Sequence, residues 1–109
     1  MNWWDTFWKD GDIHISLRDI LKYLKNEPVV DIQPEKLKHA LISVKRDPAR
    51  IMAADLNCPI IVTKVDEKFK KILDGQHRLV KALTNNEPTV KIKVLDLDTA
   101  PDDYKELFS

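Results

Sequence analysis

The segment CPIIVTKVDEKFKKILDGQHRLVKAL, residues 58–83, constrains the fold more than any other part of the chain. Pro59 opens an apolar run that is typical of a buried strand, and the polar VDEK sequence separates this run from a second strand, FKKIL. The glycine of DGQHR then marks a turn. Residues 76–86 follow with the spacing of an amphipathic helix, with Leu79, Val80, Ala82 and Leu83 facing inward. The pattern predicts a β-hairpin followed by a strand–turn–helix unit.

Shorter elements are predicted before this unit. DIHIS alternates as a short strand does, and Ser16 and Asp19 have the spacing of a capping box for a helix around residues 17–25. A strand that continues to about Ile20 is the alternative. NEPVVDIQ breaks the helix, and Pro34 opens another one, in which the helical spacing is repeated by Leu37, Ala40, Leu41 and Val44.

Further elements complete a compact arrangement. ARIMAADLN predicts a short helical turn, TVKIKVLDL alternates as a half-exposed strand, and Pro101 begins a terminal helix. Neither a repeat nor a linker interrupts the sequence. We therefore predict one α+β domain over residues 12–109, with a small mixed β-sheet flanked by helices.

Residues 1–11 form a separate aromatic segment in this interpretation. Trp3, Trp4, Phe7 and Trp8 are spaced at i, i+1, i+4 and i+5, which gathers them on one face if the segment is a helix. Such a face predicts docking on the core, on a second copy of the chain in a homodimer, or on another protein partner. The acids on the other face, Asp5 and Asp10, disfavour attachment to a membrane surface.

The charge balance bears on nucleic-acid binding. The 109 residues include 18 basic and 18 acidic side chains, so the formal net charge is zero. Tight nonspecific binding to DNA needs a basic face that contacts many phosphates, so DNA is a partner that the sequence allows but does not favour. Two local basic groups, Lys68–Lys70–Lys71 and Lys45–Arg46–Arg50, are interpreted as solvated surface.

Cysteine and histidine usage points to a cytoplasmic chain without a structural metal. Cys58 is the single cysteine, which excludes a disulfide scaffold and is interpreted as a core residue. The three histidines lack metal-ligand spacing. The sequence also contains no apolar run long enough for a membrane span and no signal-peptide pattern.

The DGQHR turn gathers groups that suit an anionic ligand. The first amides of a helix are unpaired and carry partial positive charge, and Gly75 lets a ligand approach the backbone. Arg78 can clamp a phosphate, and His77 can donate a hydrogen bond or shuttle a proton. Asp74 can hold Mg²⁺ or accept a proton, while Gln76 donates and accepts without charge. Together these groups predict a phosphate site with an acid beside it.

A purely structural interpretation stays open. In it, Asp74 caps the helix, Gly75 serves the turn, and His77 and Arg78 are surface residues. The pattern is shorter than a Walker loop, and the sequence contains no glycine-rich loop of that kind.

At these residues the chain resembles the ParB/sulfiredoxin-like superfamily. DGQHRLVKAL is similar to its Asp-Gly-x-His-Arg-x-x-x-Ala signature and matches the core that names DGQHR-type domains, which occur in DNA sulfur-modification and related systems. The resemblance covers about residues 12–97 and is strongest over 58–83. Members of the superfamily bind nucleotides at this turn: ParB proteins use CTP, sulfiredoxin uses ATP, and a free-serine kinase uses ADP.

The resemblance implies a site for ATP, ADP or CTP with Mg²⁺. Gly75, Gln76, His77 and Arg78 would surround the phosphates, and Asp74 would act as acid, base or metal ligand at the reacting end. Arg50 is expected to reach a second phosphate, with an ion pair to Asp47 or Asp55 as the alternative. The serine kinase uses a glutamate before its long helix as base. The candidates for this base here are Glu27, which we prefer, and Glu35. The alternative is that both are solvated surface acids.

Differences between this sequence and known members of the family argue against some of the family's activities. Gln76 stands where sulfiredoxin has its catalytic cysteine, so thiol repair is not supported. His77 replaces an arginine of the ParB turn, and 109 residues leave no room for ParB's helix-turn-helix region and dimerisation tail. The favoured hypothesis is a small nucleotide-dependent phosphotransferase or NTPase. The alternatives are a non-catalytic nucleotide-sensing or protein-interaction module and an accessory of DNA modification or processing.

Overall fold

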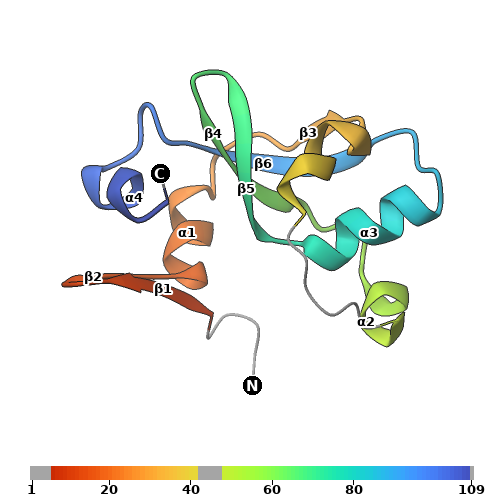
Figure 1. The fold of residues 1–109 in the computed structure, drawn as a ribbon, viewed down its shortest axis with the longest axis horizontal. Coiled ribbons are helices and arrows are strands. Elements are labelled where there is room, and N and C mark those ends of the chain that lie inside the picture. The colour runs from red at the N-terminus through yellow and green to blue at the C-terminus, as the bar shows by residue number, and fades with distance from the viewer. Residues whose placement is uncertain (1–5, 42–47, 109) are drawn as a thin grey trace.

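The computed structural model describes residues 6–41 and 48–108, and Figure 1 shows their arrangement. The elements follow the chain as β1 (Phe7–Asp10), β2 (Ile13–Ser16), α1 (Leu17–Tyr23), β3 (Val30–Ile32), the 3₁₀ helix η2 (Pro34–Ala40), α2 (Pro48–Ala53), β4 (Ile60–Val65), β5 (Lys68–Asp74), α3 (Gln76–Thr84), β6 (Val90–Asp96) and α4 (Asp102–Phe108).

A four-stranded mixed sheet with the order β3-β6-β4-β5 forms the centre. β4 and β5 make the predicted antiparallel hairpin, which returns the chain to the end where β4 begins. α3 then carries the chain across, so that β6 runs parallel to β4. β3 adds an antiparallel edge strand on the other side of β6. The predicted α+β class with a small mixed sheet is confirmed.

Alternate residues of β4 face two different hydrophobic clusters, as the period of a strand requires. Ile60 and Val62 pack with η2 and α3, in a cluster that includes Leu37, Leu79, Ala82, Val90 and Ile92. Ile61 faces the opposite side and packs with α1, α4 and β2, in a cluster that includes Ile15, Ile20, Leu95 and Phe108. The sheet therefore lies between two helical layers, which Figure 1 shows on either side of the strands.

The polar turn of the hairpin has the geometry that a right-handed sheet twist favours. Asp66 and Glu67 both have positive φ angles, 50° and 66°, as the central residues of a type I′ turn do. The backbone N–H of Asp66 donates to Oδ2 of Asp98 at 3.0 Å. This contact ties the hairpin tip to the loop after β6.

The prediction of an aromatic helix is wrong for the part that the structure describes. Phe7 and Trp8 lie in β1, which pairs with β2, and Gly11 lies in the turn between the two strands. Consecutive residues of a strand face opposite sides, so the two rings separate. The Trp8 ring packs edge-on against Phe108, with 5.4 Å between centroids, whereas the Phe7 ring contacts His14. Trp3 and Trp4 lie outside the described residues.

A second correction concerns the helix after Pro34. Residues 34–40 form a 3₁₀ helix, and Leu41 already has extended backbone angles. The buried residues Pro34, Leu37 and Ala40 are spaced by three, which matches three residues per turn better than 3.6. Val44 lies outside the described residues. The strand β3 was not predicted, because NEPVVDIQ was interpreted only as the end of a helix.

The capping box at the start of α1 is confirmed. The Asp19 N–H donates to the Ser16 hydroxyl at 3.1 Å, and the Ser16 N–H donates to the Asp19 carboxylate at 3.2 Å. These two bonds satisfy backbone donors that the first helical turn leaves unpaired. They also end β2 at Ser16, which decides against a strand that continues to Ile20. None of the helices within the described ranges has the length and apolar character needed to cross a membrane.

Ser16→Ala should lower the free energy of unfolding by about 1 kcal/mol, because it removes the side-chain half of the cap. Chemical denaturation measures the change. Thr89→Ala, at an exposed position outside every helix and strand, is the control and should leave the value nearly unchanged. Equal effects of the two substitutions would contradict the role of the cap.

The capping box also predicts a pH dependence. The hydrogen bonds from Ser16 hold the pKa of Asp19 below its ordinary value of 3.8. A carboxyl whose pKa is lowered in the folded state stabilises the fold above pH 3.8 and loses this effect as the pH falls through the folded pKa. The stability difference between the wild type and Asp19→Asn should therefore be present at pH 6 and shrink below pH 3.8. A pH-independent difference would contradict this assignment.

Candidate functional site

The turn between β5 and α3 has the predicted glycine geometry. Gly75 is the N-cap of α3 with φ 105° and ψ 21°, in the left-handed region that L side chains rarely adopt. Its carbonyl accepts the first helical hydrogen bond, from the Leu79 N–H at 3.0 Å. No side chain among residues 6–41 and 48–108 caps the helix, and Asp74 does not, so the interpretation of Asp74 as a helix cap is wrong. The N–H groups of residues 76–78 therefore have no acceptor within the described part of the chain.

Close packing gives a second reason for glycine at this position. A Cβ atom on residue 75 would lie 3.0 Å from Cγ1 and 3.2 Å from Cα of Ile60, which is fully buried at the start of β4. The same atom would lie 3.2 Å from Nη1 of Arg78. The turn therefore lies directly on the first residue of the neighbouring strand.

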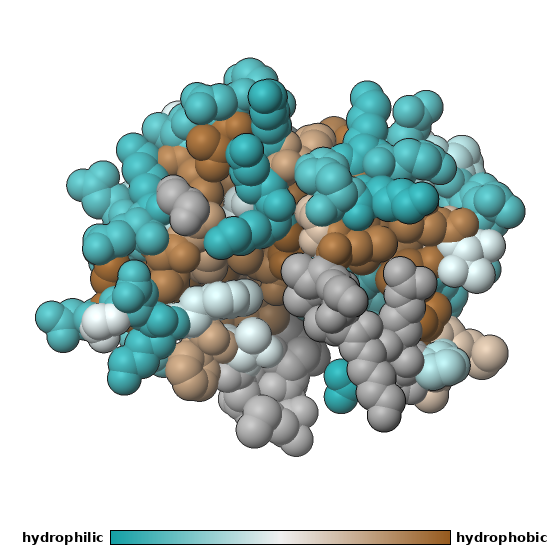
Figure 2. Space-filling model, in the orientation of Figure 1, coloured by the Kyte–Doolittle hydropathy of each residue, from teal (hydrophilic) through white to brown (hydrophobic). Residues whose placement is uncertain are grey.

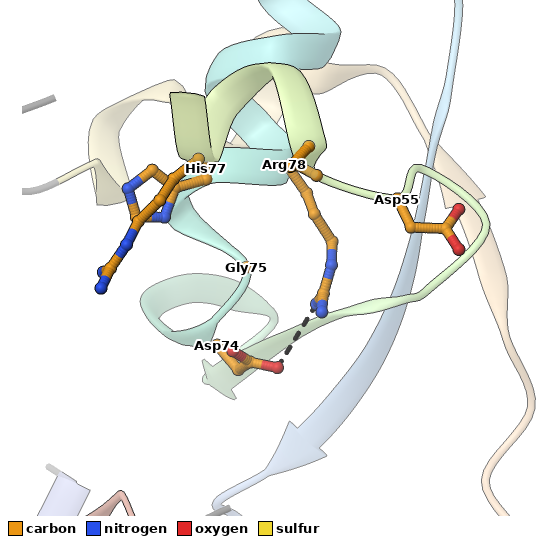
Figure 3. A pocket seen from close by; sticks show the side chains of 8 residues that line it. Asp55, Asp74, Gly75, His77 and Arg78 are labelled. Atoms are coloured by element: carbon orange, nitrogen blue, oxygen red, sulfur yellow. Dashed lines mark hydrogen bonds and ion pairs between the residues drawn. The ribbon is translucent and has the colours of Figure 1, made fainter. Parts of the chain in front are cut away.

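Arg78 joins the turn to both strands. Its Nη1 donates to Oδ2 of Asp74 at 3.3 Å and to the carbonyl oxygen of Pro59 at 3.1 Å. Figure 3 shows the arginine side chain extending toward Asp74. The Nε and Nη2 donors of Arg78 have no hydrogen-bond partner within residues 6–41 and 48–108. About a quarter of each side chain is exposed, so the pair remains accessible to a ligand.

An open cavity of about 370 Å³ lies beside the turn. Side chains of both charges line it: Arg50, Ala53, Ala54, Asp55, Asp74, Gly75, His77 and Arg78. The α2 helix and the loop after it supply one wall, and the turn with the first turn of α3 supplies the other. Two guanidinium groups, one imidazole and two carboxylates can therefore act on the same ligand.

Lys81 holds the α2 wall in place. Its ammonium group donates to the carbonyl oxygens of Met52 and Ala54, each at 2.8 Å. These carbonyls lie at the end of α2, where the last turn of a helix leaves its acceptors unpaired. A long side chain from α3 thus fixes the segment that brings Arg50 and Asp55 to the cavity.

Asp55 is a site residue that sequence reasoning missed, because it was considered only as an ion-pair partner of Arg50. Its Oδ1 accepts from the Asn57 N–H at 2.9 Å and its Oδ2 lies 3.8 Å from the Cys58 thiol. Asp-x-Asn before a strand is an Asx-turn signal that fixes the loop, although it does not show which cavity the loop meets. Cys58 is exposed, which corrects its interpretation as a core residue.

The structure brings together most of the predicted site residues. Asp74, Gly75, His77, Arg78 and Arg50 all line the cavity. The His77 side chain points away from the Asp74 carboxylate, so the two groups do not form a hydrogen-bonded pair (Figure 3).

Two predicted residues do not line the cavity. Glu27 is exposed in the connection between α1 and β3. Gln76 begins α3, and its Oε1 is buried without a hydrogen-bond partner among the described residues. An unsatisfied buried acceptor costs about 1–3 kcal/mol, so a donor that reached this oxygen would stabilise the turn.

Among the described residues, the predicted metal site at Asp74 has two carboxylates at most. Asp74 and Asp55 line the same cavity, and the described residues contain no group of three or more histidine, cysteine or acidic side chains placed to hold an ion. A resident all-protein site does not fit this donor set. Mg²⁺ that arrives on a nucleotide does fit, because it is bound through one or two carboxylates together with phosphate oxygens.

Gly75→Ala should lower the free energy of unfolding by more than 2 kcal/mol, since a left-handed alanine costs about 1–2 kcal/mol and the Ile60 contact adds to it. Gly11→Ala is a matched control: Gly11 also has positive φ, but nothing lies within 4 Å of its Cβ position. Its cost should stay within 1–2 kcal/mol. Equal losses in denaturation experiments would show that the close packing on Ile60 contributes nothing.

Comparisons of the chain with protein-family models, with curated proteins and with solved structures find no match. The α+β class with its mixed sheet is a finding of the structure itself. Membership of the ParB/sulfiredoxin-like superfamily stays a prediction, which rests on the DGQHR turn between a strand and a helix.

Proposed function

We propose that this chain is a ParB-like nucleotide-binding domain that holds phosphates at the DGQHR turn and acts as a small nucleotide-dependent phosphotransferase or NTPase. One observation carries the proposal: an open cavity at an uncapped helix start is lined by two arginines and two aspartates from separate segments. Arginines and helix amides bind phosphate, and phosphoryl transfer also needs an acid beside it.

The phosphate-binding part of the proposal uses α3 and α2. The open amides of residues 76–78 point along the helix dipole toward an anion. Arg78 retains two donor nitrogens without a partner among the described residues, and Arg50 lines the cavity from the other wall. His77 adds a third donor. Charge that develops on the transferred phosphoryl group would be stabilised by these groups.

The acidic part of the proposal uses Asp74 and Asp55. Mg²⁺ bound to the nucleotide would be held by these carboxylates and would neutralise charge on the phosphates. Asp74 accepts a proton from the attacking hydroxyl or water if its carboxylate is released from Arg78. Phosphate oxygens compete with Asp74 for Arg78, so ligand binding itself would release the carboxylate. The ion pair thus couples phosphate binding to exposure of the base.

Asp74→Asn should separate binding from turnover. Without Mg²⁺ the variant should bind ATP, ADP or CTP more tightly than the wild type, because a negative charge is removed and Arg78 is released. Phosphate release with Mg²⁺ should be lost. Arg78→Ala should weaken binding by about 10- to 100-fold, the worth of one hydrogen bond to a charged group. Calorimetry measures binding, and a thermal-shift screen identifies the nucleotide that raises the melting temperature.

Arg18→Ala, at an exposed position of α1, is the matched control and should change neither quantity. Melting temperatures of all variants exclude unfolding as the cause, since Arg78 also contacts Pro59. Absence of nucleotide binding by the wild type would overturn the proposal. Weaker binding by Asp74→Asn without Mg²⁺ would overturn the competition between Asp74 and phosphate.

The second candidate is a non-catalytic nucleotide-sensing module. The position of Glu27 favours this candidate. Of the two acids predicted to be catalytic, Asp74 and Glu27, only Asp74 lines the cavity. Phe7, 55% exposed on β1, is then a contact for a second copy or another protein partner. Nucleotide binding without phosphate release would select this candidate.

A further inference from the structure

A second concave surface lies between η2 and the β4–β5 hairpin. It encloses about 510 Å³ and is lined by Lys36, His39, Glu67, Lys68, Phe69 and Lys70, which we call the basic groove. It shares no lining residue with the cavity at the DGQHR turn. Figure 2 shows hydrophilic side chains gathered over the hairpin and over η2 on the same face of the molecule.

The three lysines of the basic groove form no ion pair with any of the described residues. Lys36, Lys68 and Lys70 are exposed, and none has a carboxylate within 4.0 Å among the residues that the structure describes. Glu67 is the one acid among the described lining residues, and it lies 3.9 Å from Lys64. The described lining residues thus include three lysines and one carboxylate, an excess of positive charge that an anionic ligand would balance.

The groove also has a fixed aromatic wall. The carbonyl oxygen of Phe69 accepts a hydrogen bond from Nε2 of His39 at 2.7 Å, which joins η2 to β5. The Phe69 side chain is half-buried and packs against the hydrophobic cluster of η2 and α3. Because one part of the Phe69 ring is packed against this cluster, the exposed part can contact a flat apolar group with little loss of side-chain entropy.

We propose that the basic groove binds a segment of single-stranded nucleic acid. Lysines that line a groove suit successive phosphates, and an aromatic ring in the same groove suits a stacked base. A flexible single strand can turn a base toward Phe69, whereas a duplex keeps its bases stacked inside. An acidic peptide would use the lysines but not the ring. Three phosphate contacts are also a small footprint, which agrees with the zero net charge of the chain.

The experiment measures binding of a labelled short oligothymidylate by fluorescence anisotropy between 50 and 200 mM salt. Three contacts on a single strand predict a slope of about −2 in log K against log salt, and an affinity loss of about 20-fold over this range. Replacing Lys36, Lys68 and Lys70 by alanine should abolish the salt-dependent binding. Phe69→Leu should weaken binding about tenfold while the slope stays the same.

The control variant replaces Lys38, Lys71 and Lys91 by alanine, which removes the same charge from exposed positions outside the groove. It should bind like the wild type, as should Arg78→Ala, because the turn cavity is a separate site. Melting temperatures confirm that each variant is folded.

Four outcomes would overturn the proposal. The first is absent binding at 50 mM salt, and the second is an equal loss of binding in the two triple variants. The third is that duplex DNA or polyglutamate binds as tightly as the oligonucleotide and that Phe69→Leu has no effect. Loss of oligonucleotide binding in Arg78→Ala would move the site to the turn and would also overturn it. The nucleotide proposal is tested separately, because Arg78 does not line the basic groove.

Discussion

The close packing of Gly75 on Ile60 is the contact on which the site depends. It brings the end of β5, the start of β4 and the first turn of α3 together, and Arg78 links the same three segments through Asp74 and Pro59. Because no described side chain caps the helix start, the first amides of α3 lack an acceptor in this part of the chain, where these segments meet. A tightly packed turn thus lies beside polar groups that stay incompletely satisfied within the described residues, which is a common property of binding sites.

The same strand connects the two proposed ligand sites. β5 begins with the lysines of the basic groove and ends at Asp74 in the turn cavity. One site suits the phosphates of a nucleotide, and the other suits the backbone and a base of a strand. Both ligands carry phosphate, but the turn offers amides, guanidinium groups and carboxylates, whereas the groove offers ammonium groups and an aromatic ring. The two sites therefore differ in chemistry as well as position.

Local patterns predicted much of the fold, and the failures have physical reasons. The hairpin, α3 and the capping box of α1 were predicted because their signals lie within a few residues. The aromatic spacing at Phe7 and Trp8 suggested a helix, but pairing with β2 satisfies the backbone of these residues instead. The periods of three and 3.6 are too similar over the seven residues of η2 to tell it from an α-helix.

The sequence by itself determined the DGQHR turn, its glycine and the residue types beside it, since these depend on neighbours along the chain. Only the tertiary structure decided that Asp55 joins Asp74, that Glu27 stays outside the cavity, and that Arg78 also donates to the carbonyl oxygen of Pro59. Likewise, Lys36 of η2 lines the same groove as Lys68 and Lys70 only because η2 packs against β5. Such groupings depend on contacts between segments far apart in the chain, which no local spacing encodes.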